Sequence, residues 1–246
     1  MAISYLDNGG FSIFILKAYN VNVSFPATVS ANDILIMQVI ISVATTFNAV
    51  ADWTLEAQDV DTGSQATFAL YSKRATGSES GTVNVTANGT ELIGGIISRF
   101  SGCVESGAYI EGLNAAYLRQ TNSLRVPSLT TTGANRLAVF CAQIEDDVLP
   151  SAYPGSWVEE WTFDSALQTD QAVLMALQAA PDTDTIAEGE CTYTGTDSVG
   201  SFSFALIPAT GGVDTLTAQN IAAGAVAISQ PTLGQIHITG CLELFI

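Results

Sequence analysis

Apolar and polar residues alternate along several segments of the chain. Val83 and Val85 are separated by polar residues, and in 191–194 a cysteine and a tyrosine share one face while two threonines take the other. A repeat of two residues is typical of a β-strand with one buried face. Residues 67–71, TFALY, are aromatic and apolar, as in a central strand. The pattern predicts β structure.

Turn residues separate these segments. Glycine-containing turn sequences lie at 61–63, 88–89, 132–133 and 154–155. Regularly spaced turns without a long helical repeat favour an all-β sandwich. The one helix candidate, 165–180, aligns with 66–73, which favours a strand rich in alanine. A β-hairpin is expected around Asn8 and Gly9.

Part of the sequence is repeated within the chain. ANDILIMQVI at 31–40 returns as ANRLAVFCAQI from Ala134, and each copy is followed by a polar stretch and a tryptophan, Trp53 or Trp157. Three further segments follow in the same order, so we interpret 21–101 and 124–207 as an internal duplication. We expect both tryptophans to pack in a core. The predicted organisation is an N-terminal hairpin (1–20), a duplicated sandwich (21–210) and a C-terminal segment (211–246).

Two repeats of four or five strands suit a jelly-roll-like β-sandwich, in which two sheets close over one core. Of the 246 residues, 48% are hydrophobic and 13% charged, which is ample material for that core. No apolar run approaches the ~18 residues of a membrane span. No secretory signal is readable at the N-terminus. We therefore expect a soluble protein made in the cytoplasm, with no membrane insertion.

The charge is strongly negative. Seven lysines and arginines stand against 24 acidic residues, a net charge of −17, and residues 137–246 contain no lysine or arginine. A phosphate backbone would be repelled by such a surface, so nucleic acid is not an expected partner. The acidity serves solubility, for instance in a salty medium, or else cation-mediated contact with a partner.

A loose sequence motif in the first half of the chain resembles a pattern found in a known protein family. It consists of Pro26, Val29, Asp33, Leu35, Trp53, Thr54, Leu55, Tyr71 and Lys73. This order resembles β-sandwich modules in structural proteins of tailed bacteriophages. Residues 216–244 resemble a short module appended to such proteins in phages of α-proteobacteria. The resemblance implies a virion component, synthesised in the host bacterial cytoplasm, whose partners are other virion proteins and further copies of itself. A tail or tail-fibre position is favoured, with capsid decoration, cement or head spike as the alternative.

Candidate catalytic chemistry is weak. His237 and Cys241 share one strand face, but four residues along a strand is about 13 Å, too far for the histidine to take the thiol proton. Acidic pairs at Asp59 and Asp61 and at Asp182 and Asp184 suggest calcium ligands, although none follows the EF-hand spacing. Solvated loops are the simpler explanation. The sequence predicts no catalytic residues, and calcium is the one cofactor it suggests.

Two features suggest interaction surfaces. Trp161 follows two glutamates and, if exposed, would offer a stacking platform for a host-surface sugar. The final strand carries an apolar face with a histidine opposite, so segment 211–246 is expected to dock on another chain. Its predicted contact residues are Ile236, His237, Ile238, Leu242 and Leu244.

The four cysteines lie far apart in the sequence, which argues against a zinc site. Cys141 falls in an apolar strand and is expected as a buried thiol, whereas Cys103 follows a turn and is expected nearer the surface. Whether these two, Cys191 or Cys241 form intersubunit disulfides stays open. Three classes remain: a virion structural protein, a glycan-binding adhesin and a glycan-processing enzyme. The high apolar content favours the first.

Overall fold

The described part of the protein is built from β-strands. A computed structural model describes residues 2–60, 66–144, 148–164, 171–180 and 182–209. These residues contain no helix, and so none that could cross a membrane. The all-β fold class expected from the sequence is confirmed. The strands are β1 (Ser4–Asn8), β2 (Ser12–Ser24), β3 (Ile34–Ile41), β4 (Thr54–Val60), β5 (Thr67–Arg74), β6 (Thr82–Ser101), β7 (Ile110–Val126), β8 (Leu129–Thr130), β9 (Arg136–Ile144), β10 (Val158–Asp164), β11 (Ala172–Ala180), β12 (Thr185–Ile186) and β13 (Gly189–Leu206).

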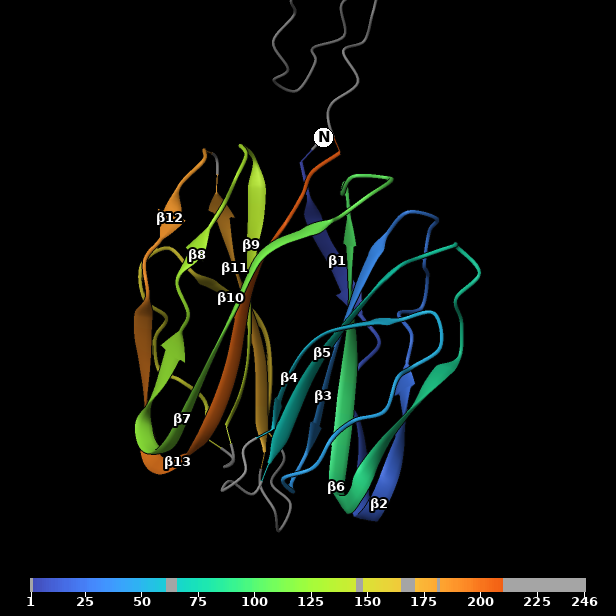
Figure 1. The fold of residues 1–246 in the computed structure, drawn as a ribbon, viewed down its shortest axis with the longest axis vertical. Coiled ribbons are helices and arrows are strands. Elements are labelled where there is room, and N and C mark those ends of the chain that lie inside the picture. Colours follow the sequence, from blue (N-terminus) through green and yellow to red (C-terminus); the bar gives the residue numbers. More distant parts are fainter. Residues whose placement is uncertain (1, 61–65, 145–147, 165–170, 181, 210–246) are drawn as a thin grey trace, which may run out of the picture. The chain divides into compact units, whose positions relative to one another are not determined.

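Two main sheets share one order of pairing. The first half of the described chain, β1 to β6, forms a sheet in the order β1-β6-β3-β5-β4, with β2 also on β6. In the second half, five strands form the order β10-β11-β9-β13-β7, and the short strands β8 and β12 pair with each other as a separate two-stranded sheet. Figure 1 shows the two sets of strands side by side. Reading from β4 and from β10, the order is the same, although a common origin by duplication stays an interpretation.

Local geometry also matches between the halves. Asn32 lies just before β3 with φ 70°, and Asn135 lies just before β9 with φ 59°. Asparagine enters this left-handed region more readily than other side chains do, which suits it to these two turns. Trp53 and Trp157 immediately precede β4 and β10, and each donates its backbone N–H to the residue three positions earlier. The two tryptophans therefore occupy equivalent positions.

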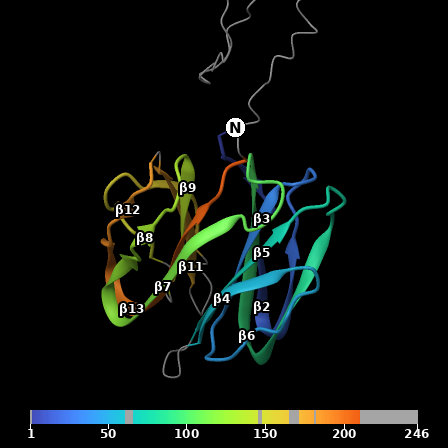
Figure 2. The same cartoon turned by 45° about the horizontal axis from the view of Figure 1, so that its top comes forward.

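The two sheets pack face to face, and the apolar interior is divided into three cores. All eight residues of β3 are buried, because alternate side chains serve two different cores. Leu35 and Met37 face the core of the first half, whereas Ile36 faces the core shared with the second half. Figure 2 shows the strands of the two halves in a second view. An apolar run without alternation is the pattern of a strand buried on both faces. The shared core contains Ile34, Ile36, Ile40, Phe68, Leu70, Phe100, Cys103, Val139, Cys141, Val173, Met175, Phe202, Phe204 and Leu206.

This division differs from the single core expected of two closing sheets. The second half has its own core around Phe140, Trp157 and Leu174. Across the shared core, the rings of Phe68 and Phe202 stack with their centroids 5.0 Å apart. Each half thus covers the outer face of its sheet with its own strands and loops, and the inner faces cover one another.

The N-terminal strands do not form the expected hairpin. β1 and β2 both pair with β6, a strand of 20 residues, and lie one after the other along it. Gly9 is required between them because a Cβ there would lie 1.9 Å from the carbonyl oxygen of Ser24. β1 is fixed by Arg99, whose guanidinium donates to Asp7 at 2.8 and 3.1 Å and to Asp33 at 3.2 Å. The glycine therefore marks a close backbone approach, not a two-residue turn.

Residues 172–180 form β11, so the strand alternative is correct for them, while 165–170 lie outside the described residues.

The link between the halves, 102–109, is held by Arg74, which donates to the carbonyl oxygens of Val104 and Gly107. Near this link the first and last described residues, Ala2 and Ala209, both lie beside Gly102. Ala209 donates its N–H to Gly102 at 2.8 Å, and a Cβ on Gly102 would lie 2.3 Å from the carbonyl oxygen of Ala2.

Candidate functional site

Trp161 was expected to serve as a sugar platform if it were exposed, but it is half-buried. Its side chain packs against the shared core, on the inner face of β10. The indole Nε1–H donates to Ser98 Oγ on β6 at 3.1 Å. The polar atom of the ring is thus used within the protein. The condition for a sugar-stacking site at Trp161 is not met.

The other two tryptophans pack as expected. Trp157 is buried in the core of the second half, where its ring lies 5.8 Å from that of Phe140. Trp53 is half-buried against the core of the first half and stacks on Phe25 with a centroid distance of 6.3 Å. These rings stabilise the two halves separately.

The proposed calcium ligands do not form a cage in the described structure. Asp59 is on β4, and its Oδ2 lies 3.6 Å from the position that a Cβ on Gly200 would take. Asp61 lies outside the described residues. No group of three His, Cys, Asp or Glu side chains within the described ranges is close enough to hold a metal ion.

Asp182 and Asp184 lie in the turn before β12, with exposed side chains. The backbone carbonyl oxygens of both accept a hydrogen bond from Thr131 Oγ1, at 3.2 and 3.3 Å, and Asp184 Oδ1 accepts from the N–H of Thr185 at 2.6 Å. The contacts shown here hold the turn against the segment that carries Thr131. The structural role of this acidic pair is therefore visible, and calcium binding stays a prediction.

The predicted docking residues of the C-terminal segment, Ile236, His237, Ile238, Leu242 and Leu244, lie outside the described residues. The chain divides into two units, Met1–Gly211 and Gly212–Ile246, and all the described residues belong to the first. The sequence placed its boundary one residue earlier, and the docking role of the C-terminal segment stays a prediction.

Six of the seven cations interact with other groups of the protein, and the side chain of the seventh, Arg119, lies outside the description. Lys17 pairs with Glu91, Lys73 with Glu79, Arg99 with Asp7 and Asp33, Arg125 with Glu188, and Arg136 with Glu111, while Arg74 holds the link between the halves. Because the cations are paired in this way and acidic residues outnumber them, the net charge left for the surface is negative. Such a surface repels polyanions.

The carboxylate of Glu111 is held ionised by the contacts around it. Burial alone would raise the pKa of Glu111, but hydrogen bonds from Arg136 and Thr132 outweigh burial and lower the pKa below its ordinary value. Arg136 Nε donates to Glu111 at 2.8 Å and the hydroxyl of Thr132 donates at 2.6 Å. A carboxylate held ionised by these contacts is a poor general acid at neutral pH. Glu111 is therefore an anchor for the loop before β9.

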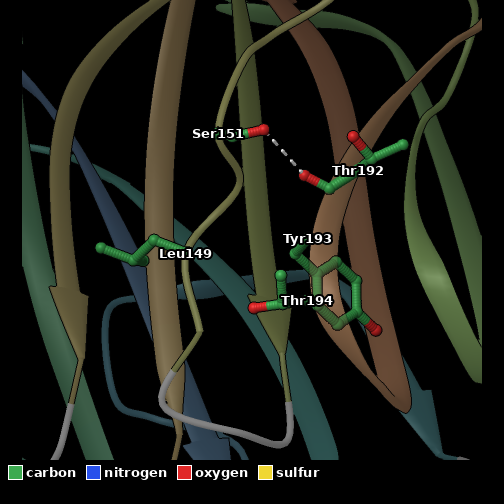
Figure 3. Close-up of a pocket in the computed structure, with 5 residues that line it drawn as sticks. All are labelled: Leu149, Ser151, Thr192, Tyr193 and Thr194. Carbon is green, nitrogen blue, oxygen red and sulfur yellow. Dashed lines mark hydrogen bonds between the residues drawn. The ribbon is translucent and has the colours of Figure 1, made fainter.

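One hollow lies on the described surface of the second half. It has a volume of about 240 Å³ and is lined by Leu149, Ser151, Thr192, Tyr193 and Thr194 (Figure 3). Ser151 Oγ donates to the carbonyl oxygen of Thr192 at 3.4 Å. The hollow is smaller than the ~300 Å³ at which typical ligand pockets begin. Tyr193 is buried in the core of the second half, so its ring is not a stacking platform.

The described cysteines are all buried free thiols. Cys141 is buried as expected, but Cys103 is only 3% exposed and not near the surface, because it packs in the shared core. Burial raises the pKa of Cys103 and of Cys191 to about 12. A thiol with so high a pKa is a poor nucleophile at neutral pH. Cys241 lies outside the described residues.

Comparison with known protein families, with curated proteins and with solved structures finds no match to this chain. The class that the geometry defines is an all-β sandwich of two halves with one strand order. Sequence reasoning missed the contact between Trp161 and Ser98. The packing of one sheet against the other was needed to find it.

Proposed function

We propose that this protein is a non-enzymatic structural component of a phage virion, associated with the tail or tail fibre, and that it works by assembling with other subunits. The proposal rests on one observation: the polar side chains described above mainly bind one another and hold the fold together. The best-supported carboxylates, Glu79, Glu111 and Asp7, each bind a cation and hold a loop or strand in place. A scaffold of this kind suits a role in contact and support.

The surface charge agrees with this role. Nucleic acid as a partner is disfavoured because the net charge is −17. Large apolar side chains are also exposed on strands of both halves: Leu6, Tyr19, Leu55 and Val158 are 43%, 61%, 40% and 66% exposed. Exposed apolar side chains are candidates for contact with neighbouring subunits. The partners we propose are other virion proteins and further copies of this chain.

The phage assignment rests on the sequence resemblance and is tested by locating the chain. Antibody raised against the purified protein would be applied to intact virions and viewed by electron microscopy. Label on the tail is expected. Label confined to the capsid would favour the alternative, a decoration, cement or head-spike protein. Virions that carry no label, and whose mass spectrum lacks the chain, would contradict both.

A second candidate, a glycan-binding adhesin, is favoured by one observation. The hollow in Figure 3 presents three hydroxyl side chains, those of Ser151, Thr192 and Thr194, beside Leu149. Hydroxyl groups can exchange hydrogen bonds with a sugar. Binding to a glycan array that is lost on Thr194→Val and kept on Thr76→Val, a change on the other half, would support this candidate over purely structural assembly.

A further inference from the structure

β4 and β10 occupy equivalent edges of the two main sheets, and each has an open side. β4 pairs only with β5, and β10 pairs only with β11, among the described strands. Each begins with exposed apolar surface, at Leu55 on β4 and at Val158 on β10. An open strand edge with apolar side chains is a template to which a second chain can add a strand. Both edges therefore need some device that controls pairing.

A β-bulge interrupts β4 near its start. Leu55 lies opposite Tyr71, and Ala57 lies opposite Leu70, the residue adjacent to Tyr71 on β5. Glu56 is therefore an extra residue without an opposite partner on β5. Its Oε1 accepts a hydrogen bond from the hydroxyl of Ser72 at 2.5 Å, which holds the bulge in place.

The equivalent bulge interrupts β10. Glu159 lies opposite Ala176, and Trp161 lies opposite Met175, so Glu160 is the extra residue. Its position relative to the preceding tryptophan is the same as that of Glu56: each follows its tryptophan by three residues. A β-bulge whose extra residue is a glutamate thus occurs at the equivalent position of β4 and of β10.

A bulge bends the strand and increases its twist, so the row of N–H and C=O groups on the open side loses its regular spacing. Both edge strands have only seven residues, and the bulge leaves two residues before it and four after it. An incoming straight strand could match only one of these short pieces.

We propose that the bulges at Glu56 and Glu160 block strand addition to the two open edges, so that copies of this chain do not join sheet to sheet through β4 or β10. The inference concerns the strand edges and does not depend on the proposed function. It means that contacts between copies use other surfaces of the protein.

Deletion of Glu160 tests this directly in the full-length chain. The deletion removes only the unpaired residue and leaves Glu159 opposite Ala176 and Trp161 opposite Met175. The matched control, Glu160→Ala, removes the charge but keeps the extra residue. Sedimentation velocity is expected to show a larger oligomer for the deletion than for the unaltered chain, and no change for Glu160→Ala.

Two outcomes overturn the proposal. One is a deletion variant that keeps the circular dichroism spectrum and the oligomeric state of the unaltered chain. The other is a Glu160→Ala variant that associates as strongly as the deletion, because the charge and not the bulge would then control pairing. Deletion of Glu56 repeats the test on β4.

A measurement on the unaltered chain covers the case in which neither deletion variant folds. At about 1 M salt the Debye length falls to about 3 Å, so the edge carboxylates are screened while the bulges remain. The oligomeric state is expected to be the same at low and high salt, or to change in a way that Val158→Lys does not affect. Association that appears at high salt and is abolished by Val158→Lys would place the contact on the β10 edge and overturn the proposal.

Discussion

The indole N–H of Trp161 donates to the hydroxyl of Ser98 at 3.1 Å, and this bond joins β10 in the second half to β6 in the first. Ser98 is fully buried. The bond lies against the shared core, whose other contacts are mainly apolar and therefore set no particular register. A directional bond of this kind helps to fix how the two halves meet.

A double-mutant cycle with Trp161→Phe and Ser98→Ala measures that bond. Each single variant is expected to lower the free energy of unfolding, and the coupling energy is expected to be about 1 kcal/mol. Denaturant unfolding followed by circular dichroism gives the four values. The control pair, Trp53→Phe with Ser98→Ala, should be additive because Trp53 packs in the core of the first half. Additivity in both cycles would contradict the assignment of the bond.

Gln38→Leu is expected to raise the free energy of unfolding by about 1 kcal/mol. Gln38 is 1% exposed on β3, and neither atom of its amide has a hydrogen-bond partner among the described residues. Leucine fills a similar space without a polar group to bury. The control is Gln58→Leu, which should be destabilising because Gln58 Oε1 accepts from the N–H of Phe47 at 2.7 Å. A Gln38→Leu variant less stable than the unaltered chain would show that the amide has a partner.

Glu79→Gln is expected to destabilise the fold in a pH-dependent way. Burial would raise the pKa of Glu79, but hydrogen bonds from the backbone, Lys73 and Thr76 lower it from 4.5 to about 2. Because the folded-state pKa is the lower one, the stabilisation is present above pH 4.5 and is lost as the pH falls through about 2. We expect a cost of about 2 kcal/mol at neutral pH and almost none near pH 2.

Urea unfolding of the Glu79→Gln variant and the unaltered chain across this pH range gives the comparison. The exposed Glu190→Gln serves as the control and should follow the unaltered chain. An equal loss of stability for Glu79→Gln at neutral and at low pH would rule out the charge as the cause.

The described thiols are expected to be unreactive in the folded protein. Cys103, Cys141 and Cys191 are all buried, and burial raises the pKa of each. In a Cys241→Ser variant, a maleimide reagent should add to no cysteine in buffer and to three in denaturant, as counted by mass spectrometry. Rapid labelling in buffer, or a disulfide-linked dimer of this variant, would contradict the packing of the cores.

Removal of residues 212–246 is expected to leave a folded, β-rich protein that assembles less well. The last described strand ends at Leu206, and the unit Met1–Gly211 contains all three cores. Circular dichroism and light scattering after gel filtration would compare the truncated and the full chain. If the truncated protein unfolds, the segment belongs to the fold and the docking hypothesis is wrong.

The central strands could be predicted because their apolar runs are long and repeated. Residues 34–41 and 67–71 are buried on both faces, so their sequences carry a strong signal that does not depend on register. The equivalence of Trp53 and Trp157 followed from the same repeat. These features depend on local sequence and on burial, which a single chain records directly.

Other features depend on contacts that the sequence does not record. Glu160 is the extra residue of a bulge, so the alternation along β10 is broken and Trp161 falls on the inner face. Gly9 was interpreted as a turn residue, but it is needed because Ser24 lies against it. Cys103 is buried by strands from both halves. In each case the deciding neighbour is distant in sequence.

Ala2 and Ala209 both lie beside Gly102, at one end of the described sandwich. A mechanical load applied between these two residues would not shear the strands along their length. It would open the sheets from that end and break the bonds between Ser4 and Ser101 before those further along β1. Such peeling needs less force than shear, because the bonds fail one after another. An assembly that transmits tension through this unit would therefore have to bind it at surfaces other than those around Ala2 and Ala209.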